Sequence, residues 1–185
     1  IEGIGLSCGG LAGVGAEGKS VLTSFSMSPQ GIIGSLPLEQ ASAISGTGYL
    51  SLLSMLLRYH VVSQEGTFAA VFEHAHSPIR QKILQNLHTS PAGSGMRIGQ
   101  LKMTAGDVEE LLKVKGAYSL AVKTLLEEGD LQAKDLKKIY LAGALGEHVN
   151  SLDLLDLGFL PQSSDGKIEA VGNSSLAGAV LLKEE

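Results

Sequence analysis

The sequence is poor in cysteine and in basic residues, and it has no long apolar run. The single cysteine, Cys8, excludes an intramolecular disulfide, cannot hold an iron–sulfur cluster alone, and fits a reducing cytoplasm. Lysine and arginine number 14 against 19 acidic residues, and the net charge of −5 argues against a nucleic-acid binder. The densest apolar stretch, residues 49–57, is interrupted by Ser51 and Ser54, so no membrane span is predicted.

Glycine and apolar residues are abundant instead. The 24 glycines predict many tight turns and close backbone contacts, and the 44% hydrophobic content of the 185 residues predicts one domain with a substantial core. The chain opens on Ile1 inside the glycine-rich stretch IEGIGLSCGG, which we interpret as the start of a cut chain.

Apolar periodicity predicts an α/β protein. Thr104 and Asp107 have the spacing of a capping box at a helix start, and Gly129 ends that helix. Strands and helices alternate in the last third, so the last two strands should be adjacent and parallel. The expected elements are a hairpin of 21–27 with 31–36, helices over 44–60, 79–87, 104–128, 150–157 and 174–183, and strands over 96–103, 139–143 and 167–172.

The stretch KKIYLAGALGEHVN, residues 137–150, changes from an apolar strand to very small residues. Gly143, Ala144 and Gly146 follow the strand, and such residues allow another group to approach the backbone closely. That group is either a ligand at the end of a sheet or another segment of the same protein.

Two further features admit both a functional and a structural interpretation. Gly46 and Gly48 precede a buried helix, where they suit either an anion site at the helix N-terminus or a capped turn. Lys115 falls in the middle of an apolar helical stripe, so it either extends to solvent or meets an anion. The stripe consists of Val108, Leu111, Leu112, Tyr118 and Val122.

Three residues are weaker candidates for chemistry. His74 and His76 would share one face of a strand and could bind zinc or nickel, but no third ligand follows at a typical spacing. A native metal site is therefore not expected. Cys8 suits a small buried residue better than a nucleophile.

Four segments carry a resemblance to a known family. They are IEGIGLSCGG (1–10), AISGTGYLSLLSMLL (43–57), MTAGDVEELLKVKGAYSLAVKTLL (103–126), and IYLAGALGEHVNSLDLLDLGFLP (139–161) with VGNSSLAGAVLL (171–182). Taken together, they resemble the reductive activators of corrinoid proteins. That resemblance implies the C-terminal domain of these proteins, a ribonuclease-H-like (actin-like ATPase) lobe with a mixed sheet, from the superfamily of acetate and sugar kinases, heat-shock chaperones and actin. It also implies the family's activity, in which ATP with Mg drives cobalt(II) to cobalt(I) reduction on a corrinoid protein of a methyltransferase system.

The resemblance also assigns residues. Ile139–Gly146 matches the superfamily's adenosine motif, and 172–182 matches its second connecting helix. Lys115 aligns with a lysine of the family's helix and is expected to face the adenosine side, near Gly143 and Gly146. The nucleotide-binding residues it implies are Gly143, Ala144, Gly146, Lys115, Gly46, Gly48 and Asn173.

The sequence departs from the family in three places. Nothing matches the two Asp-x-Gly phosphate hairpins, the ferredoxin cysteines that would hold an iron–sulfur cluster are absent, and Leu145 and Glu147-His148 replace the family's residues in the adenosine motif. We therefore expect residues 1–185 to be one domain, the later part of the C-terminal domain, and inactive alone. A docking module for a corrinoid protein and a fragment of a small-molecule kinase remain as alternatives, and a homodimer is left open.

Overall fold

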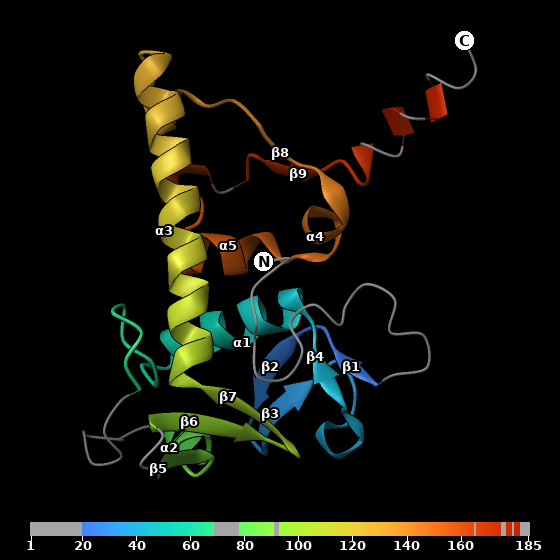
Figure 1. Cartoon of the computed structure of the whole chain (residues 1–185), viewed down its shortest axis with the longest axis vertical. Helices are drawn as coiled ribbons and strands as arrows, with labels where there is room; N and C mark the ends of the chain where they lie inside the picture. Colours follow the sequence, from blue (N-terminus) through green and yellow to red (C-terminus); the bar gives the residue numbers. More distant parts are fainter. Residues whose placement is uncertain are drawn as a thin grey trace.

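The computed structural model describes residues 20–68, 78–90, 93–164, 166–174, 177–178 and 180–181. Within them the elements form two parts joined by one long helix, α3, which runs along one side of the molecule (Figure 1). Three small sheets lie beneath and beside helix α1 in the lower part of that view, and one parallel strand pair lies with two short helices in the upper part. Cys8, His74 and His76 lie outside the described residues.

Helix α1, Gly46–Arg58, is the centre of the lower part. Nine of its residues in succession, Gly48 to Leu56, are buried, which confirms the buried helix expected from its apolar circumference. β1 (Val21–Leu22) runs parallel to β4 (Ala43–Ile44) beside it. β2 (Phe25–Ser28) and β3 (Gly31–Gly34) form the predicted antiparallel hairpin, followed by the short 3₁₀ turn η1 (Leu38–Gln40).

The segment 78–104 shows where the predicted boundaries were wrong. Helix α2 (Pro78–Leu84) is shorter than expected, and β5 (Leu87–Ser90) follows it. The predicted strand over 96–103 is a hairpin of β6 (Gly93–Ile98) and β7 (Leu101–Thr104). The chain turns at Gly99, which has φ +58° and where a Cβ atom would lie 2.3 Å from the carbonyl oxygen of Leu38. Only glycine satisfies both conditions.

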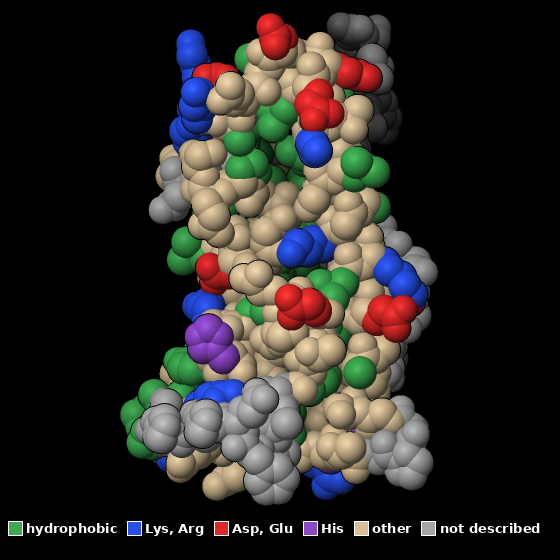
Figure 2. Space-filling view, turned by 90° about the vertical axis from the view of Figure 1, so that its left-hand side faces the viewer, with side chains coloured by type: hydrophobic (Ala, Val, Ile, Leu, Met, Phe, Trp, Pro, Cys, Tyr) green, Lys and Arg blue, Asp and Glu red, His purple; other side chains and the backbone are tan. Residues whose placement is uncertain are grey.

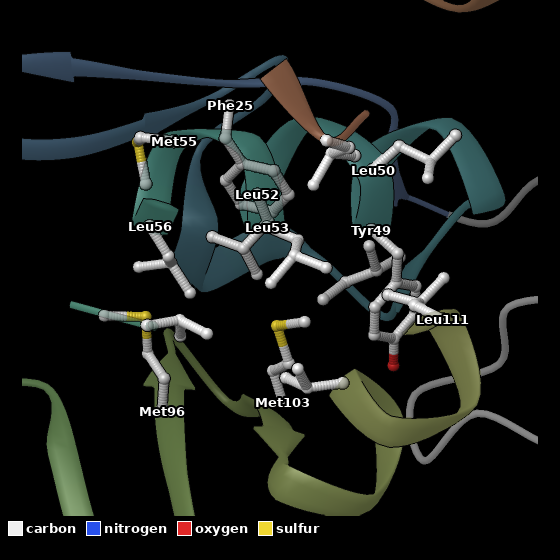
Figure 3. Packing of buried hydrophobic residues seen from close by; sticks show 14 of the residues in the cluster. Phe25, Tyr49, Leu50, Leu52, Leu53, Met55, Leu56, Met96, Met103 and Leu111 are labelled. Carbon is white, nitrogen blue, oxygen red and sulfur yellow. The ribbon is translucent and has the colours of Figure 1, made fainter. Parts of the chain in front are cut away.

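Helix α3, Ala105–Glu128, begins and ends where the sequence predicts. Thr104 and Asp107 form the capping box, and Gly129 is the C-cap. Its first turns are buried, since Val108 and Leu111 are at most 1% exposed, but Leu120 and Leu125 in its second half are 65% and 68% exposed. Figure 3 shows α1 side chains packed toward Met96 and Met103 of the β6–β7 hairpin and Leu111 of α3. The core therefore centres on α1, and buried residues of α5 and the segment after it extend it into the upper part; these are Leu154, Leu155, Leu157, Phe159 and Leu160.

The upper part contains β8 (Ile139–Leu141), α4 (Gly143–His148), α5 (Ser151–Asp156) and β9 (Ile168–Ala170). β8 and β9 are parallel, with Ile139 paired to Ile168, as predicted. The strand ends two residues earlier than expected because Gly143 already begins α4. The 3₁₀ turns η2 (Ala133–Asp135) and η3 (Gln162–Ser164) pack together beside this pair. The described residues after 173, namely 174, 177–178 and 180–181, are helical.

Candidate functional site

The turn after β8 is held by backbone and faces open space. Gly143 has φ +88°, and its N–H donates a 2.8 Å hydrogen bond to the carbonyl oxygen of Gly172, which has φ +68°. A Cβ atom added at either glycine would meet no described atom within 4 Å. Glycine is therefore required here by backbone conformation and not by crowding, and the turn stays accessible to a ligand.

At position 146, glycine is required by crowding. It is buried, and a Cβ atom there would lie 2.9 Å from the carbonyl carbon and 3.0 Å from the Cβ of Leu141. Helix α4 thus folds back against the end of β8, and only a residue without a side chain allows that approach. The two glycines of the stretch 137–150 answer different demands, one from conformation at the surface and one from packing.

The β8–β9 pairing brings four of the sequence-predicted residues into one region. Gly143, Ala144 and Gly146 belong to α4, and Asn173 directly follows the glycine that accepts the hydrogen bond of Gly143. Asn173 is exposed. We name Gly143, Ala144, Gly172 and Asn173 the β8–β9 turn site.

The other predicted glycines, Gly46 and Gly48, lie at the start of α1. The Ser45 hydroxyl caps this helix by accepting the Gly48 N–H at 3.0 Å and donating to the carbonyl oxygen of Leu22. A Cβ at Gly48 would lie 2.4 Å from that same oxygen. Packing against β1 therefore explains Gly48, and the serine occupies the helix N-terminus. Helix α1 also packs against α4, so the two glycine turns belong to elements in contact.

Lys115, which was expected to face the adenosine side, lies beside the end of α5. Its side chain is half-buried, and its Cε and Nζ atoms lie 3.4 Å from where a Cβ of Gly158 would stand, just beyond the C-terminus of α5. It lines a pocket of about 200 Å³ with Leu112, Asp156 and Gln162, and none of the turn-site residues lines that pocket. A cation beside a helix C-terminus is favourable without any ligand. This position accounts for Lys115 without a nucleotide, and the expected nucleotide contact is left to experiment.

A charged cluster that the sequence did not reveal joins α1 to α5. The guanidinium of Arg58 lies 2.8 Å from a carboxylate oxygen of Asp153 and 2.8 Å from one of Asp156. It also donates to the hydroxyl of Ser54 at 2.9 Å, and that hydroxyl donates to Asp156. Arg58 is the last residue of a helix and its two carboxylate partners are 95 or more positions away, so no short motif could have indicated the cluster.

Two further features, a groove and a shielded histidine, have no assigned chemistry. A groove of about 330 Å³ lies between α3 and residues 158–161, and Figure 2 shows a hollow lined by hydrophobic side chains in the upper part of the molecule. His88, opposite Gly95 on the β5–β6 pair, has both ring nitrogens shielded from solvent, with no hydrogen-bond partner in the described structure. Burial lowers the pKa of His88, and the nearby charges of Lys102 and Arg97 lower it further.

The described residues lack a metal cluster, a membrane-spanning helix and an Asp-x-Gly hairpin. They contain no group of three or more His, Cys, Asp or Glu side chains arranged to hold a metal ion. No helix among them has the length and apolarity needed to cross a bilayer. Asp156-Leu157-Gly158 has the letters of an Asp-x-Gly motif, but it forms the end of α5 and not a hairpin.

Comparison with known proteins finds both a matching family model and individual relatives of this chain. A family model described as the C-terminal domain of RACo, the ASKHA domain, matches residues 1–184. The corrinoid activation enzyme RamQ of Eubacterium limosum is 25% identical over 202 residues, covering 100% of this chain and 32% of RamQ. The solved structure of a reductive activator for corrinoid, iron-sulfur protein superposes with a TM-score of 0.70 at 22% identity. That match covers 87% of this chain and 26% of the other, so the chain spans at most about a third of either relative.

Proposed function

This chain belongs to the family of the RACo C-terminal ASKHA domain, and we propose that it is the nucleotide-binding lobe of an ATP-dependent reductive activator that returns cobalt(II) corrinoid proteins to cobalt(I). The names of the two relatives support an activator of corrinoid proteins. The ASKHA assignment and the β8–β9 turn site support a nucleotide as the ligand.

One observation carries the proposal. Gly143 and Gly172 are joined by a hydrogen bond, both have positive φ, and a Cβ at either would meet no described atom within 4 Å. The adenosine portion of ATP would lie against this backbone, with Asn173 beside it as a side chain able to donate and accept hydrogen bonds. ATP bound there would supply the free energy for a low-potential reduction. This chain's residues would bind and orient the nucleoside.

The phosphates and Mg are proposed to be held elsewhere in the activator. The sequence contains no Asp-x-Gly hairpin, and the strands that carry the turn site are poorly covered. No residue of β8 or β9 is fully buried, and Tyr140 is 58% exposed. Parallel strands are normally covered on both faces. We infer that further strands of the activator complete this sheet and bring the phosphate-binding residues to it.

The proposed partner is a corrinoid protein of a methyltransferase system, acting in the cytoplasm. An iron–sulfur cluster in another domain of the activator would supply the electron, because the one cysteine of this chain cannot hold a cluster. Lys115, Gly46 and Gly48 are not needed for this proposal, since packing and the C-terminus of α5 account for Gly48 and Lys115.

Nucleotide titration tests the proposal. ATP should bind this chain with a Kd no tighter than roughly 1 mM, because a few backbone and apolar contacts barely exceed the entropic cost of association. The full-length activator should bind it more tightly, and cobalt(I) should form only with ATP and the corrinoid protein together. Micromolar binding by this chain would instead indicate a phosphate site within it, with Gly46–Gly48 the first candidate.

A matched pair of variants localises the site. Gly143→Ala and Gly166→Ala both place a Cβ at a positive φ, +88° and +73°, with no described atom within 4 Å. The cost to folding should therefore be similar. Only Gly143→Ala should weaken ATP binding, since only that Cβ would stand in the turn site. Equal ATP affinity for the two variants would contradict the proposed location.

A further inference from the structure

The cluster centred on Arg58 fixes how α5 lies on α1. Arg58 is the last residue of α1, and it contacts one carboxylate in the first turn of α5, Asp153, and one at its end, Asp156. The Asp153 side chain is only 4% exposed, and Ser54, which contacts both Arg58 and Asp156, is fully buried. We name Ser54, Arg58, Asp153 and Asp156 the α1–α5 clamp.

The clamp is better suited to fixing a register than to adding stability. One cation faces two carboxylates, and burying a carboxylate such as Asp153 offsets much of the attraction it gains. What such a contact determines is position, because a planar guanidinium satisfies two carboxylates only at one spacing and angle. Sliding α5 along α1 by one turn would break both ion pairs.

Helix α5 is joined to the turn site by a very short connection. Val149 is the C-cap of α4 and Asn150 is the N-cap of α5, where its side chain accepts the N–H of Leu152 at 3.0 Å. At its other end the N-cap of α4 is Ala142, and no side chain of the described residues caps the helix there. With six residues and an uncapped start, α4 is too short to hold itself in place. Its position depends on the end of β8, against which Gly146 packs, on its contact with α1 and on its short connection to α5.

We propose that Arg58 is a positioning residue for the Gly143 turn, holding α5 and thereby α4 in the orientation that presents the turn to nucleotide. This inference rests on the proposed function in one respect, namely that the oriented turn binds nucleotide. The mechanical link from Arg58 through α5 to α4 rests on the clamp geometry alone.

Three clamp variants test the link. Arg58→Gln removes the charge, and Arg58→Lys keeps the charge but loses the planar fork. Because Arg58→Gln leaves Asp153 buried without its partner, the double variant Arg58→Gln with Asp153→Asn replaces the ion pair by two amides. Ile83→Val and Ile83→Ala serve as controls, since they remove methyl groups from a fully buried side chain on α2, which packs on β3. For each clamp variant, the comparison uses whichever of these two controls has the nearer Tm.

Peptide-resolved amide exchange on this chain gives the first readout, well below Tm. Relative to residues 93–104, residues 143–157 should exchange at least about tenfold faster in Arg58→Gln and in the double variant, and Arg58→Lys should restore part of the protection. The control should accelerate both segments alike. Equal acceleration of both segments in the clamp variants would overturn the proposal.

ATP-induced NMR shifts at the amides of 143–146, recorded at millimolar ATP, give the second readout. The apparent Kd should rise at least about fivefold in the double variant and stay unchanged in the matched control. An unchanged Kd in the double variant would overturn the positioning role. If the unmodified chain shows no shift at up to about 20 mM ATP, and the full-length activator shows none either, the proposed function fails. The exchange measurement still decides whether Arg58 positions the turn.

Discussion

Replacing glycine by alanine at two helical positions should change stability in opposite directions. Gly116 lies in the exposed middle of α3, and a Cβ there would meet no described atom within 4 Å. Gly146 lies in α4, and its Cβ would stand 2.9 Å from the carbonyl carbon of Leu141. Alanine in a helix is favoured over glycine by about 0.5–1 kcal/mol at either position. The two sites therefore share the favourable contribution and differ in the steric one.

The steric cost decides whether each substitution raises or lowers the free energy of unfolding. At Gly146 two of the three nearest atoms are backbone atoms of β8, which cannot rotate away, so α4 must move off the strand. Overpacking of this kind costs about 1–3 kcal/mol. We expect Gly116→Ala to raise the free energy of unfolding by about 0.5–1 kcal/mol and Gly146→Ala to lower it by about 1–2 kcal/mol.

Urea denaturation followed by far-UV circular dichroism measures both changes, and equal m-values would show that the same transition is compared. A Gly146→Ala variant as stable as the Gly116→Ala variant would refute the packing argument. Gly146 would then have to be explained by the close approach of a ligand.

The remaining predictions concern two titratable side chains. Lys115→Met should change ATP affinity in the full-length activator by less than about 0.5 kcal/mol, because Lys115 lies against Gly158 and lines a pocket that none of the turn-site residues lines. A calorimetric loss of about 1.5–3 kcal/mol would instead indicate that Lys115 contacts the nucleotide. His88 has a folded-state pKa below its ordinary value of 6.5, owing to burial and to Lys102 and Arg97. The unfolded chain therefore protonates first on acidification. The stability that His88 contributes should be complete above pH 6.5 and lost as pH falls from there through the folded-state pKa. Urea midpoints between pH 7.5 and 5 should fall less in a His88→Gln variant, and an unchanged slope would contradict this.

Local signals predicted most of the fold. The capping box of Thr104 and Asp107, the hairpin of β2 with β3 and the buried α1 each depend on residues within a few positions of one another. The turn at Gly99 was missed because the apolar residues around it continue one pattern through Ile98 and Leu101. What makes it a turn is the approach of Leu38, about 60 positions earlier in the chain, which the pattern does not contain.

The candidate site divides in the same way. Gly143 and Asn173 were identified from the sequence, the first from a strand followed by small residues and both through resemblance to a family, and the β8–β9 pairing brings them together. Whether they bind nucleotide is still a prediction. Lys115 was singled out because it lies within an apolar stripe of α3. Such a stripe determines only the side of the helix on which a residue lies, and the neighbour on that side is the segment that ends α5. No sequence pattern indicated Arg58, because its role depends on a buried carboxylate 95 positions away.

The turn site lies in the half of the molecule that is least able to hold itself together. The lower part packs α1 against three small sheets, whereas β8 and β9 bury no residue fully and the second half of α3 leaves Leu120 and Leu125 exposed. Within the described residues, the upper part is tied to the lower part by α3, by the contacts of α1 with α4 and α5, by the α1–α5 clamp, and by the buried apolar residues of 154–160 that join the core. Any segment that covers the β8–β9 sheet would therefore stabilise the turn site selectively. In an activator, that dependence would couple nucleotide binding to the assembly of the surrounding lobe, because binding energy gained at the turn opposes opening of the same strands.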